Sequence, residues 1–417
     1  MPILVGCGQC GNQLQYSILD ALNEQFRGVP KDKESMDAFF RESSGGRQVA
    51  RAVCLDTEPK VIERCVELAR GKGEWQYDGR STAFTHGGAG NNWARGYQMC
   101  SGAFMDTSLD CVRRELEHTD WPSCLLMLNS LGGGTGSGFG TRMSEAVADE
   151  FPDTTRVNLV ISPYHFGEVV VQNYNASLCL AKLSSCSHAV VTFENEIARD
   201  LCTTMRGLKS PSLSDVNRTI ADHMLSVLLP RRRAGGHAVT SLVDDIAHLC
   251  SHPGLKFLDI KATPQTPDAS VEFTFDNWKS ILKTLERMSA LGVQSERGIS
   301  RGVSRELQSE QTCRSYASTL ILRGLDAQQT SAQFLQQAPP SVQVHWSDRS
   351  VMYQRSAALL SNSQSVLPVL QRPIHKATEM FKAGAFLHQY TGCGLDVNDF
   401  RESFQVLGQS IENYKAL

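Results

Sequence analysis

Short apolar runs alternate with amphipathic segments through the first half of the chain. The apolar runs lie at residues 2–5, 49–55, 124–131, 157–161 and 189–193, and helical spacing of apolar residues follows most of them. Short runs that are mostly apolar are typical of strands buried on both faces, and their alternation with helices indicates a parallel sheet with helices on both sides. We therefore predict an α/β domain at residues 1–230, with a core helix near its end.

Beyond this domain the pattern becomes mixed. It predicts strands at 256–260, 271–275, 315–322, 342–346 and 356–360, helices at 276–291 and 327–337, and a polar loop at 297–311. We therefore predict an α+β domain over residues 231–364, which begins with a solvated loop at Arg231–Arg233. Residues 365–417 predict a C-terminal helical hairpin, whose second helix carries an apolar stripe at Val397, Phe400, Phe404, Leu407, Ile411 and Tyr414.

The stretch Gly132–Gly138 contains five glycines, together with Thr135 and Ser137, between a buried strand and a helix. Glycine allows a tight turn with exposed backbone N–H groups, and the helix that follows presents the positive end of its dipole. This arrangement favours phosphate binding. No lysine follows the glycines, as a P-loop requires, and Thr135 stands where a hydrolase nucleophile turn needs glycine. The alternative is a merely flexible loop.

The opening turn, Gly6-Cys-Gly-Gln-Cys-Gly11, satisfies the spacing Gly-x-Gly-x-x-Gly between a strand and a helix. This spacing is typical of dinucleotide sites, which also need an acidic residue about twenty positions further on. Here the next strand ends at Asp56 after a long polar segment, which argues against that interpretation. A redox pair formed by Cys7 and Cys10 is a second alternative. We expect Asp56 to cap the helix that begins near Pro59.

Composition narrows the function classes. The chain has 417 residues, of which 41% are hydrophobic and 20% charged, with a formal net charge of −3, so a nucleic-acid-binding function is not expected. No apolar run approaches the ~18 residues of a membrane span, and no signal peptide is visible, so we expect no membrane association. We interpret the 13 cysteines as reduced core residues of a cytoplasmic protein.

The heptapeptide Gly132–Gly138 resembles the signature of the tubulin family. The stretch Gly90-Asn-Asn-Trp-Ala94 also resembles a segment of that family, as does Phe386-Leu-His-Gln-Tyr-Thr391, in the same order along the chain. Glutamine at 389, where the family has tryptophan, and Val171-Gln-Asn-Tyr-Asn175 are more similar to the delta type than to the alpha, beta or gamma types. The resemblance covers essentially the whole chain and implies a tubulin-type fold with a GTP-binding first domain.

The resemblance implies a site for GTP or GDP with Mg²⁺. Gln9 would reach the phosphates and metal, Cys10 the base, Glu58 the Mg²⁺ through water, Glu168 the sugar, and Asn195 and Asn217 the guanine. The remaining nucleotide-binding residues implied are Gly11, Asn12, Gly90, Asn91, Ser130, Gly132, Gly133, Gly134, Thr135, Gly136, Ser137 and Gly138. Two positions depart from the family: Leu213 replaces an aromatic residue that stacks on the base, and Gln172 replaces a glutamate.

The resemblance also implies longitudinal contacts with other tubulin subunits, and a weak GTPase activity that needs a carboxylate from the neighbouring subunit. Asp244 is the candidate for that carboxylate, and a solvated acid on a helix face is the alternative. The delta type suggests the cytoskeleton of centrioles, basal bodies, cilia or flagella, with centriolar or axonemal microtubules as partners. A free-standing GTPase and a dinucleotide-dependent oxidoreductase are the alternative functions.

Overall fold

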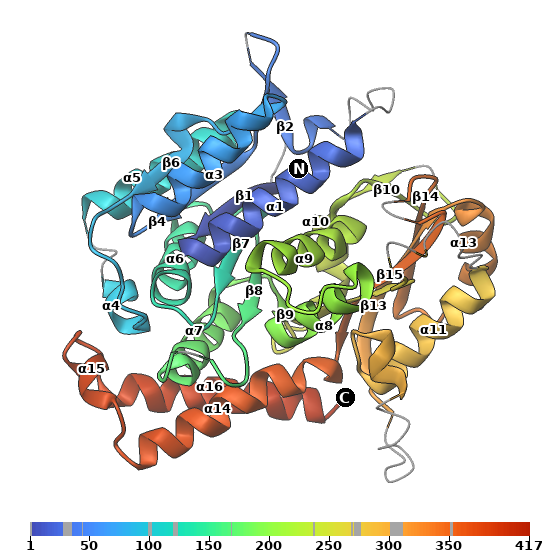
Figure 1. Ribbon diagram of the computed structural model, residues 1–417. Helices are drawn as coiled ribbons and strands as arrows, with labels where there is room; N and C mark the ends of the chain where they lie inside the picture. The colour runs from blue at the N-terminus through green and yellow to red at the C-terminus, as the bar shows by residue number, and fades with distance from the viewer. Residues whose placement is uncertain are drawn as a thin grey trace. The chain divides into compact units, whose positions relative to one another are not determined.

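The computed structural model describes residues 2–27, 36–43, 45–98, 102–119, 124–167, 169–236, 238–267, 270, 277–300, 312–350 and 353–417. The chain forms two compact units (Figure 1). Unit 1 comprises Met1–Glu194 and Pro368–Glu412, and unit 2 comprises Asn195–Leu367 and Asn413–Leu417. The division into domains at residues 230 and 364 remains a prediction from the sequence.

Unit 1 is built on six parallel strands in the order β9-β8-β7-β1-β4-β6. Their bounds are β1 Pro2–Cys7, β4 Ala52–Asp56, β6 Thr82–Phe84, β7 Cys124–Ser130, β8 Thr155–Ser162 and β9 Ala189–Glu194. The helices that lie wholly or mostly in this unit are α1 Gly8–Phe26, α3 Pro59–Lys72, α4 Trp93–Gln98, α5 Ala103–Glu117, α6 Gly140–Glu150, α7 Gln172–Cys186, α14 Leu367–Lys382, α15 Leu387–Thr391 and α16 Val397–Lys415. The predicted parallel α/β sheet is confirmed.

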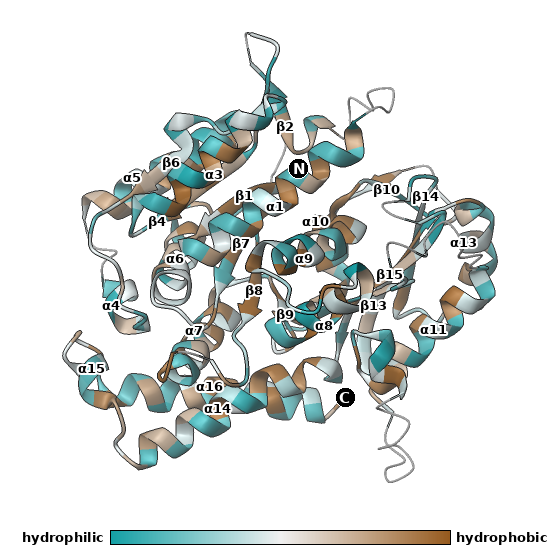
Figure 2. Cartoon of the chain, viewed as in Figure 1, coloured by the Kyte–Doolittle hydropathy of each residue, from teal (hydrophilic) through white to brown (hydrophobic). Residues whose placement is uncertain are grey.

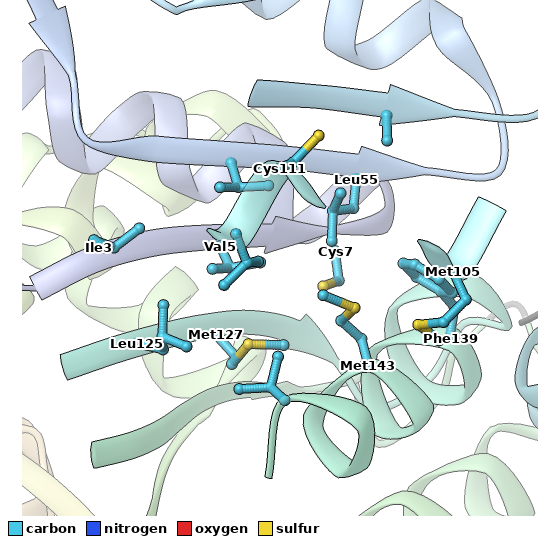
Figure 3. Packing of buried hydrophobic residues seen from close by; sticks show 14 residues of the cluster. Ile3, Val5, Cys7, Leu55, Met105, Cys111, Leu125, Met127, Phe139 and Met143 are labelled. Carbon is cyan, nitrogen blue, oxygen red and sulfur yellow. The ribbon is translucent and has the colours of Figure 1, made fainter. Parts of the chain in front are cut away.

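Alternate residues of the strands face opposite sides of this sheet, so each face has its own helices. Ile3, Val5 and Cys7 of β1 pack with α5 and α6 in one fully buried cluster. The Cys7 and Met143 side chains meet between the sheet and α6 (Figure 3). On the other face α1 packs on β1 and β7. Gly11 allows this close approach, since a Cβ there would lie 2.1 Å from the Leu128 carbonyl oxygen.

The run at 49–55, predicted as one strand, is two strands in different sheets. Residues Gln48–Ala50 (β3) pair with β2 (Phe40–Glu42) and β5 (Trp75–Gln76) in a three-stranded sheet. The strand is interrupted at Arg51, whose side chain donates to the Asp37 and His118 carbonyls, and β4 begins at the next residue. The break is invisible in the apolar pattern because both strands are buried.

Unit 2 contains a mixed six-stranded sheet in the order β11-β10-β14-β13-β15-β12. Its strands are β10 Arg231–Arg233, β11 Val239–Thr240, β12 Phe257–Thr263, β13 Ser315–Gly324, β14 Val342–Ser347 and β15 Arg355–Ser363. Its helices are α8 Asn195–Arg206, α9 Leu213–Leu228, α10 Leu242–Leu249, α11 Trp278–Leu291 and α13 Ala327–Leu335. The predicted strand at 271–275 lies outside the described residues, as do residues 301–311 of the predicted loop, whereas residues 296–300 are helical.

The prediction of a solvated loop at Arg231–Arg233 was wrong. These residues form β10, and the Arg231 side chain is buried in an ion pair with Asp245 and a hydrogen bond to the Val227 carbonyl. A guanidinium can be buried when its donors meet a carboxylate and carbonyls, which composition alone does not reveal.

The C-terminal helices are amphipathic, as predicted. Figure 2 shows polar and apolar residues alternating along α14 and α16. In α16, Phe400, Leu407, Ile411 and Tyr414 of the predicted stripe are buried. Among the described residues, no helix combines the length and apolar content needed to cross a membrane. The twelve cysteines that the structure describes form no disulfide.

Candidate nucleotide-binding site

Four loops meet at the carboxyl ends of the strands of unit 1. We call them the opening turn (residues 8–12), the acidic turn (56–58), the asparagine loop (86–92) and the glycine loop (132–138). The Thr57 and Thr135 hydroxyl oxygens are 2.6 Å apart, which joins the acidic turn to the glycine loop. A Cβ built on Gly8 would lie 2.8 Å from the Gly136 nitrogen, so the opening turn also contacts the glycine loop. Ligands of open α/β sheets bind at this edge.

The glycine loop continues β7 and leads into one turn of π-helix, Thr135–Phe139, before α6 begins. The Gly138 N–H donates to the Gly134 carbonyl (2.7 Å), and the buried Ser137 hydroxyl donates to the Gly133 carbonyl. Local π-helix is frequent at functional sites. Ser130, at the end of β7, accepts a hydrogen bond from the Gly132 N–H (3.3 Å). Phosphate binding by these residues remains a prediction.

The glycines of this loop have two different kinds of surroundings. A Cβ on Gly134 would lie 2.7 Å from both the Ala89 Cβ and the Asn92 nitrogen, and one on Gly138 would lie 2.2 Å from the Trp93 carbonyl oxygen. Gly134 is therefore required by the adjacent asparagine loop, and Gly138 by the start of α4. A Cβ on Gly133 would meet nothing closer than the Asn91 Oδ1 at 4.0 Å. Gly133 therefore borders space that a ligand could occupy.

The opening turn likewise contains both exposed and buried residues. Gln9 is exposed, whereas Cys10 is only partly exposed. Desolvation raises the pKa of the Cys10 thiol to about 12, which keeps it a neutral thiol and gives no support to a redox role. Asn12 is fully buried, and its amide donates to the Gly8 and Leu55 carbonyls at 2.9 Å each, so it fixes the turn against β4.

The acidic turn differs from the prediction. The N-cap of α3 is Glu58, not Asp56, and Asp56 is instead the buried last residue of β4. Burial raises the pKa of the Asp56 carboxyl to about 7, although the backbone N–H groups of Thr57 and Glu58 oppose that shift. A Cβ on Gly88 would lie 2.7 Å from the Glu58 Oε1, so the Glu58 carboxylate lies against the asparagine loop.

The two carboxyl groups of the acidic turn suit a hard cation such as Mg²⁺, which prefers few carboxylates and several waters. A buried carboxyl whose ionised form is disfavoured gains most from a nearby positive charge. Asp56 was missed as a metal candidate because its position before a helix also suits an N-cap. Its place at the end of a parallel strand was the signal that could have identified it.

The asparagine loop has backbone geometry that few residues adopt. Gly88, Gly90 and Asn91 all have positive φ, at 55°, 56° and 52°. Asn92 then caps α4, because its Oδ1 accepts from the Arg95 N–H at 3.1 Å. The exposed Arg95 side chain turns back over this loop and donates to the Gly87 carbonyl at 3.4 Å. Arg95 is thus a cation beside the asparagine loop, and its role was not predicted from the sequence.

The predicted sugar and base residues lie in different parts of the chain. Glu168 lies outside the described residues, and the buried Gln172 donates to the Tyr164 carbonyl at 2.8 Å. In unit 2, Asn195 opens α8, and Asn217 is 8% exposed in α9, which packs on α8. Leu213 lies one helical turn before Asn217 and is 58% exposed. Their contact with a guanine remains a prediction.

Asp244 is part of a capping box at the start of α10. Its Oδ2 accepts from the Ser241 N–H (2.8 Å) and from the Ser241 hydroxyl (3.0 Å). The side chain is exposed, so a neighbouring molecule can reach it. The adjacent Asp245 is buried against Arg231 and cannot be donated outward.

A parallel sheet with glycine-rich loops at the carboxyl ends of its strands defines an α/β protein of the nucleotide-binding architecture. Residues 2–203 match the GTPase domain of the Tubulin/FtsZ family. The chain is 32% identical to the tubulin delta chains of Canis lupus familiaris and Homo sapiens, over 99% of this chain and 99% of each relative. It is 28% identical to the tubulin beta chain of Porphyra purpurea, over 96% of this chain and 89% of that one. The chain therefore belongs to the tubulin family, and among these relatives it is more similar to the delta chains.

Proposed function

We propose that this protein binds GTP and GDP through the four loops of unit 1. The observation that carries the proposal is their convergence, which leaves Gly133 facing open space. Backbone N–H groups of the glycine loop would hold the phosphates, and Arg95 would offset the charge of the terminal phosphate. Asn195 and Asn217 would read guanine, because an amide offers both a donor and an acceptor. Family membership favours this function over the dinucleotide-dependent oxidoreductase.

Mg²⁺ fits the acidic turn, where Glu58 and Asp56 would hold it, directly or through water. Bound there, the ion would neutralise phosphate charge. The chain's own contribution is to bring the exposed Glu58 carboxylate beside the asparagine loop and the buried Asp56 carboxyl next to it, where low solvent exposure of Asp56 strengthens its interaction with a cation.

We further propose that the protein associates longitudinally with other tubulin subunits and that GTP hydrolysis requires this association. Asp244 is exposed and could orient a water molecule at a neighbour's nucleotide. The similarity to delta chains supports a role in the cytoskeleton at centrioles, basal bodies, cilia or flagella, with their microtubules as partners. A free-standing GTPase that does not assemble is the alternative.

Native purification followed by denaturation and mass spectrometry of the released nucleotide tests the central proposal. We expect guanine nucleotide at close to one molecule per chain. A nicotinamide or flavin nucleotide would instead support the oxidoreductase. The chains that co-purify separate the assembling protein from the free-standing GTPase, since only the former retains tubulin subunits.

A further inference from the structure

The side-chain amide of Asn175, in α7, joins three segments of unit 1. Asn175 is fully buried, and its Nδ2 donates to the carbonyls of Asn91 (2.8 Å) and Gly132 (2.9 Å). Its Oδ1 accepts from the Trp93 N–H (2.9 Å) and from the Tyr390 hydroxyl (2.6 Å). Two donors and two lone pairs are all that an amide offers, so this group is saturated. It thereby links the asparagine loop, the glycine loop and α15.

The partners fix the orientation of the amide. The Asn91 and Gly132 carbonyls can only accept, and the Trp93 N–H can only donate, so rotating the amide would break all three bonds. Trp93 is the first residue of α4, and its N–H has no partner within that helix. A carboxylate at position 175 would face two carbonyl oxygens without a donor. Asparagine is therefore suited to this place by its chemistry as well as by its size.

Tyr390 fixes the amide from the side of the C-terminal helices. Its ring is fully buried and contacts the rings of Tyr174 and Phe400 edge-on, with centroids 5.4 Å apart in each case. A second contact reinforces the link, because the Gln389 carbonyl accepts from the Asn92 Nδ2 at 3.2 Å. Gln389 itself is exposed, so α15 lies at the molecular surface and contacts the asparagine loop from there.

We propose that Asn175 and Tyr390 are a positioning pair that sets the spacing of the asparagine and glycine loops and couples it to α15. The proposal rests on the proposed function, in which both loops hold phosphate. Neither side chain needs to touch the nucleotide. By reciprocity, a nucleotide that orders the loops also orders α15, and a displacement of α15 weakens nucleotide binding.

The test compares Tyr390→Phe with Tyr174→Phe. Each variant removes one hydroxyl from a fully buried ring, and the two rings touch each other. The Tyr174 hydroxyl donates to the Ala385 carbonyl (3.0 Å), which belongs to neither loop, so Tyr174→Phe is the matched control. The measurements are the affinities for GTP and for guanosine, and amide hydrogen exchange at Trp93 in the nucleotide-free chain.

In Tyr390→Phe we expect GTP affinity to fall about fivefold to tenfold, the effect of one lost buried hydrogen bond, with guanosine affinity unchanged. Exchange at Trp93 should be faster in Tyr390→Phe and unchanged in Tyr174→Phe. Asn175→Asp, if it folds, should lose more GTP affinity. Equal changes in the two tyrosine variants, or equal losses for GTP and guanosine, would show a structural role only and overturn the proposal.

A wild-type chain that binds no guanine nucleotide would overturn the proposed function instead. In that case, hydrogen exchange at Trp93 still tests the positioning pair by itself, because it is measured without nucleotide. Unchanged exchange in Tyr390→Phe would then reject the pair as well.

Discussion

At the scale of single residues, Gly133 and Gly134 are neighbours with opposite constraints. Gly134 is enclosed by Ala89 and Asn92, whereas Gly133 faces open space. A substitution at Gly134 tests packing within the protein, and a substitution at Gly133 tests whether a ligand occupies the adjacent space. The two positions therefore separate folding from nucleotide binding within one loop.

We expect Gly134→Ala to lower the free energy of unfolding by about 1–3 kcal/mol, since its methyl group would force the two loops apart. Gly133→Ala should leave the urea midpoint within error and weaken GTP binding, because its methyl group would enter the space of the phosphates. Urea denaturation and fluorescent GTP titration measure the two effects. Unchanged GTP affinity in Gly133→Ala would show that no phosphate occupies the space beside Gly133.

Leu213 offers a gain-of-function test of the base site. A tyrosine at this position should tighten GTP binding about fivefold through stacking, if Leu213 covers the guanine. Leu213 is 58% exposed, and the capping box of Ser212 and Asp215 does not involve its side chain, so stability should not change. Leu213→Ile controls for the mere change of side chain. A folded tyrosine variant with wild-type affinity would place the base elsewhere.

At the scale of elements, the start of α10 combines a structural and a predicted catalytic role in one carboxylate. Ser241→Ala and Asp244→Ala both break the capping box, so each should destabilise the protein by about 1 kcal/mol. Only Asp244→Ala should abolish the GTP hydrolysis that depends on a tubulin partner. Thermal unfolding and phosphate release in complexes of equal stoichiometry measure these effects. Equal hydrolysis in the two variants would rule out Asp244 as the donated group.

The elements also show what the sequence could predict. β7, the glycine loop and α6 follow one another in the chain, so apolar pattern and turn chemistry were sufficient to predict them. The positions of β12–β15 followed for the same reason, except for residues 271–275, which lie outside the described part. The roles of Asp56, Arg231 and Asn175 did not follow. Each role depends on partners that are distant in the sequence. A polar residue read from the sequence alone is expected at the surface, whereas these three are buried.

At the scale of the whole molecule, unit 2 contains a histidine that makes stability depend on pH. His345 is fully buried, and its Nδ1 lies 2.8 Å from the Thr240 hydroxyl. Burial, followed by the charges of Arg231 and Arg233, lowers its pKa to about 3; His248 adds to that shift and Asp244 opposes it. The Asp245 Oδ1 lies 3.8 Å from the His345 Nε2, and the Oδ2 of the same carboxylate is paired with Arg231. His345 is therefore neutral in the folded protein at physiological pH.

The sign of the pH dependence follows from proton binding. Below about pH 6.5 the unfolded chain binds a proton at His345 and the folded chain does not, down to about pH 3. The stability that the neutral imidazole contributes is thus complete above pH 6.5 and declines as the pH falls. Between pH 7 and pH 5, the free energy of unfolding of His345→Gln should therefore fall by about 2 kcal/mol less than that of the wild type. Urea midpoints at both pH values test this, with the partly exposed His248→Gln as control; identical losses in wild type and His345→Gln would contradict it.

Hydrolysis is the property that most depends on more than one molecule. In unit 1 the described carboxyl groups at the four loops belong to the acidic turn, where Asp56 is buried and Glu58 would hold the metal in the proposed function. Arg95 can offset phosphate charge but cannot orient a water molecule as a base. On the proposed function we therefore expect positioning and electrostatic stabilisation, which both contribute large parts of catalysis, to be incomplete in the isolated chain.

We accordingly expect GTP bound to the isolated chain to turn over slowly at all dilutions that keep it monomeric. The rate per bound nucleotide should rise with the concentration of an added tubulin partner and reach a plateau as the complex saturates. Single-turnover phosphate release, with assembly followed in parallel by light scattering or sedimentation, measures both quantities. The Ser241→Ala chain should follow the wild-type curve, because it keeps the carboxylate of Asp244. A rate that is already maximal in the monomer would show that the site is self-sufficient and would favour the free-standing GTPase.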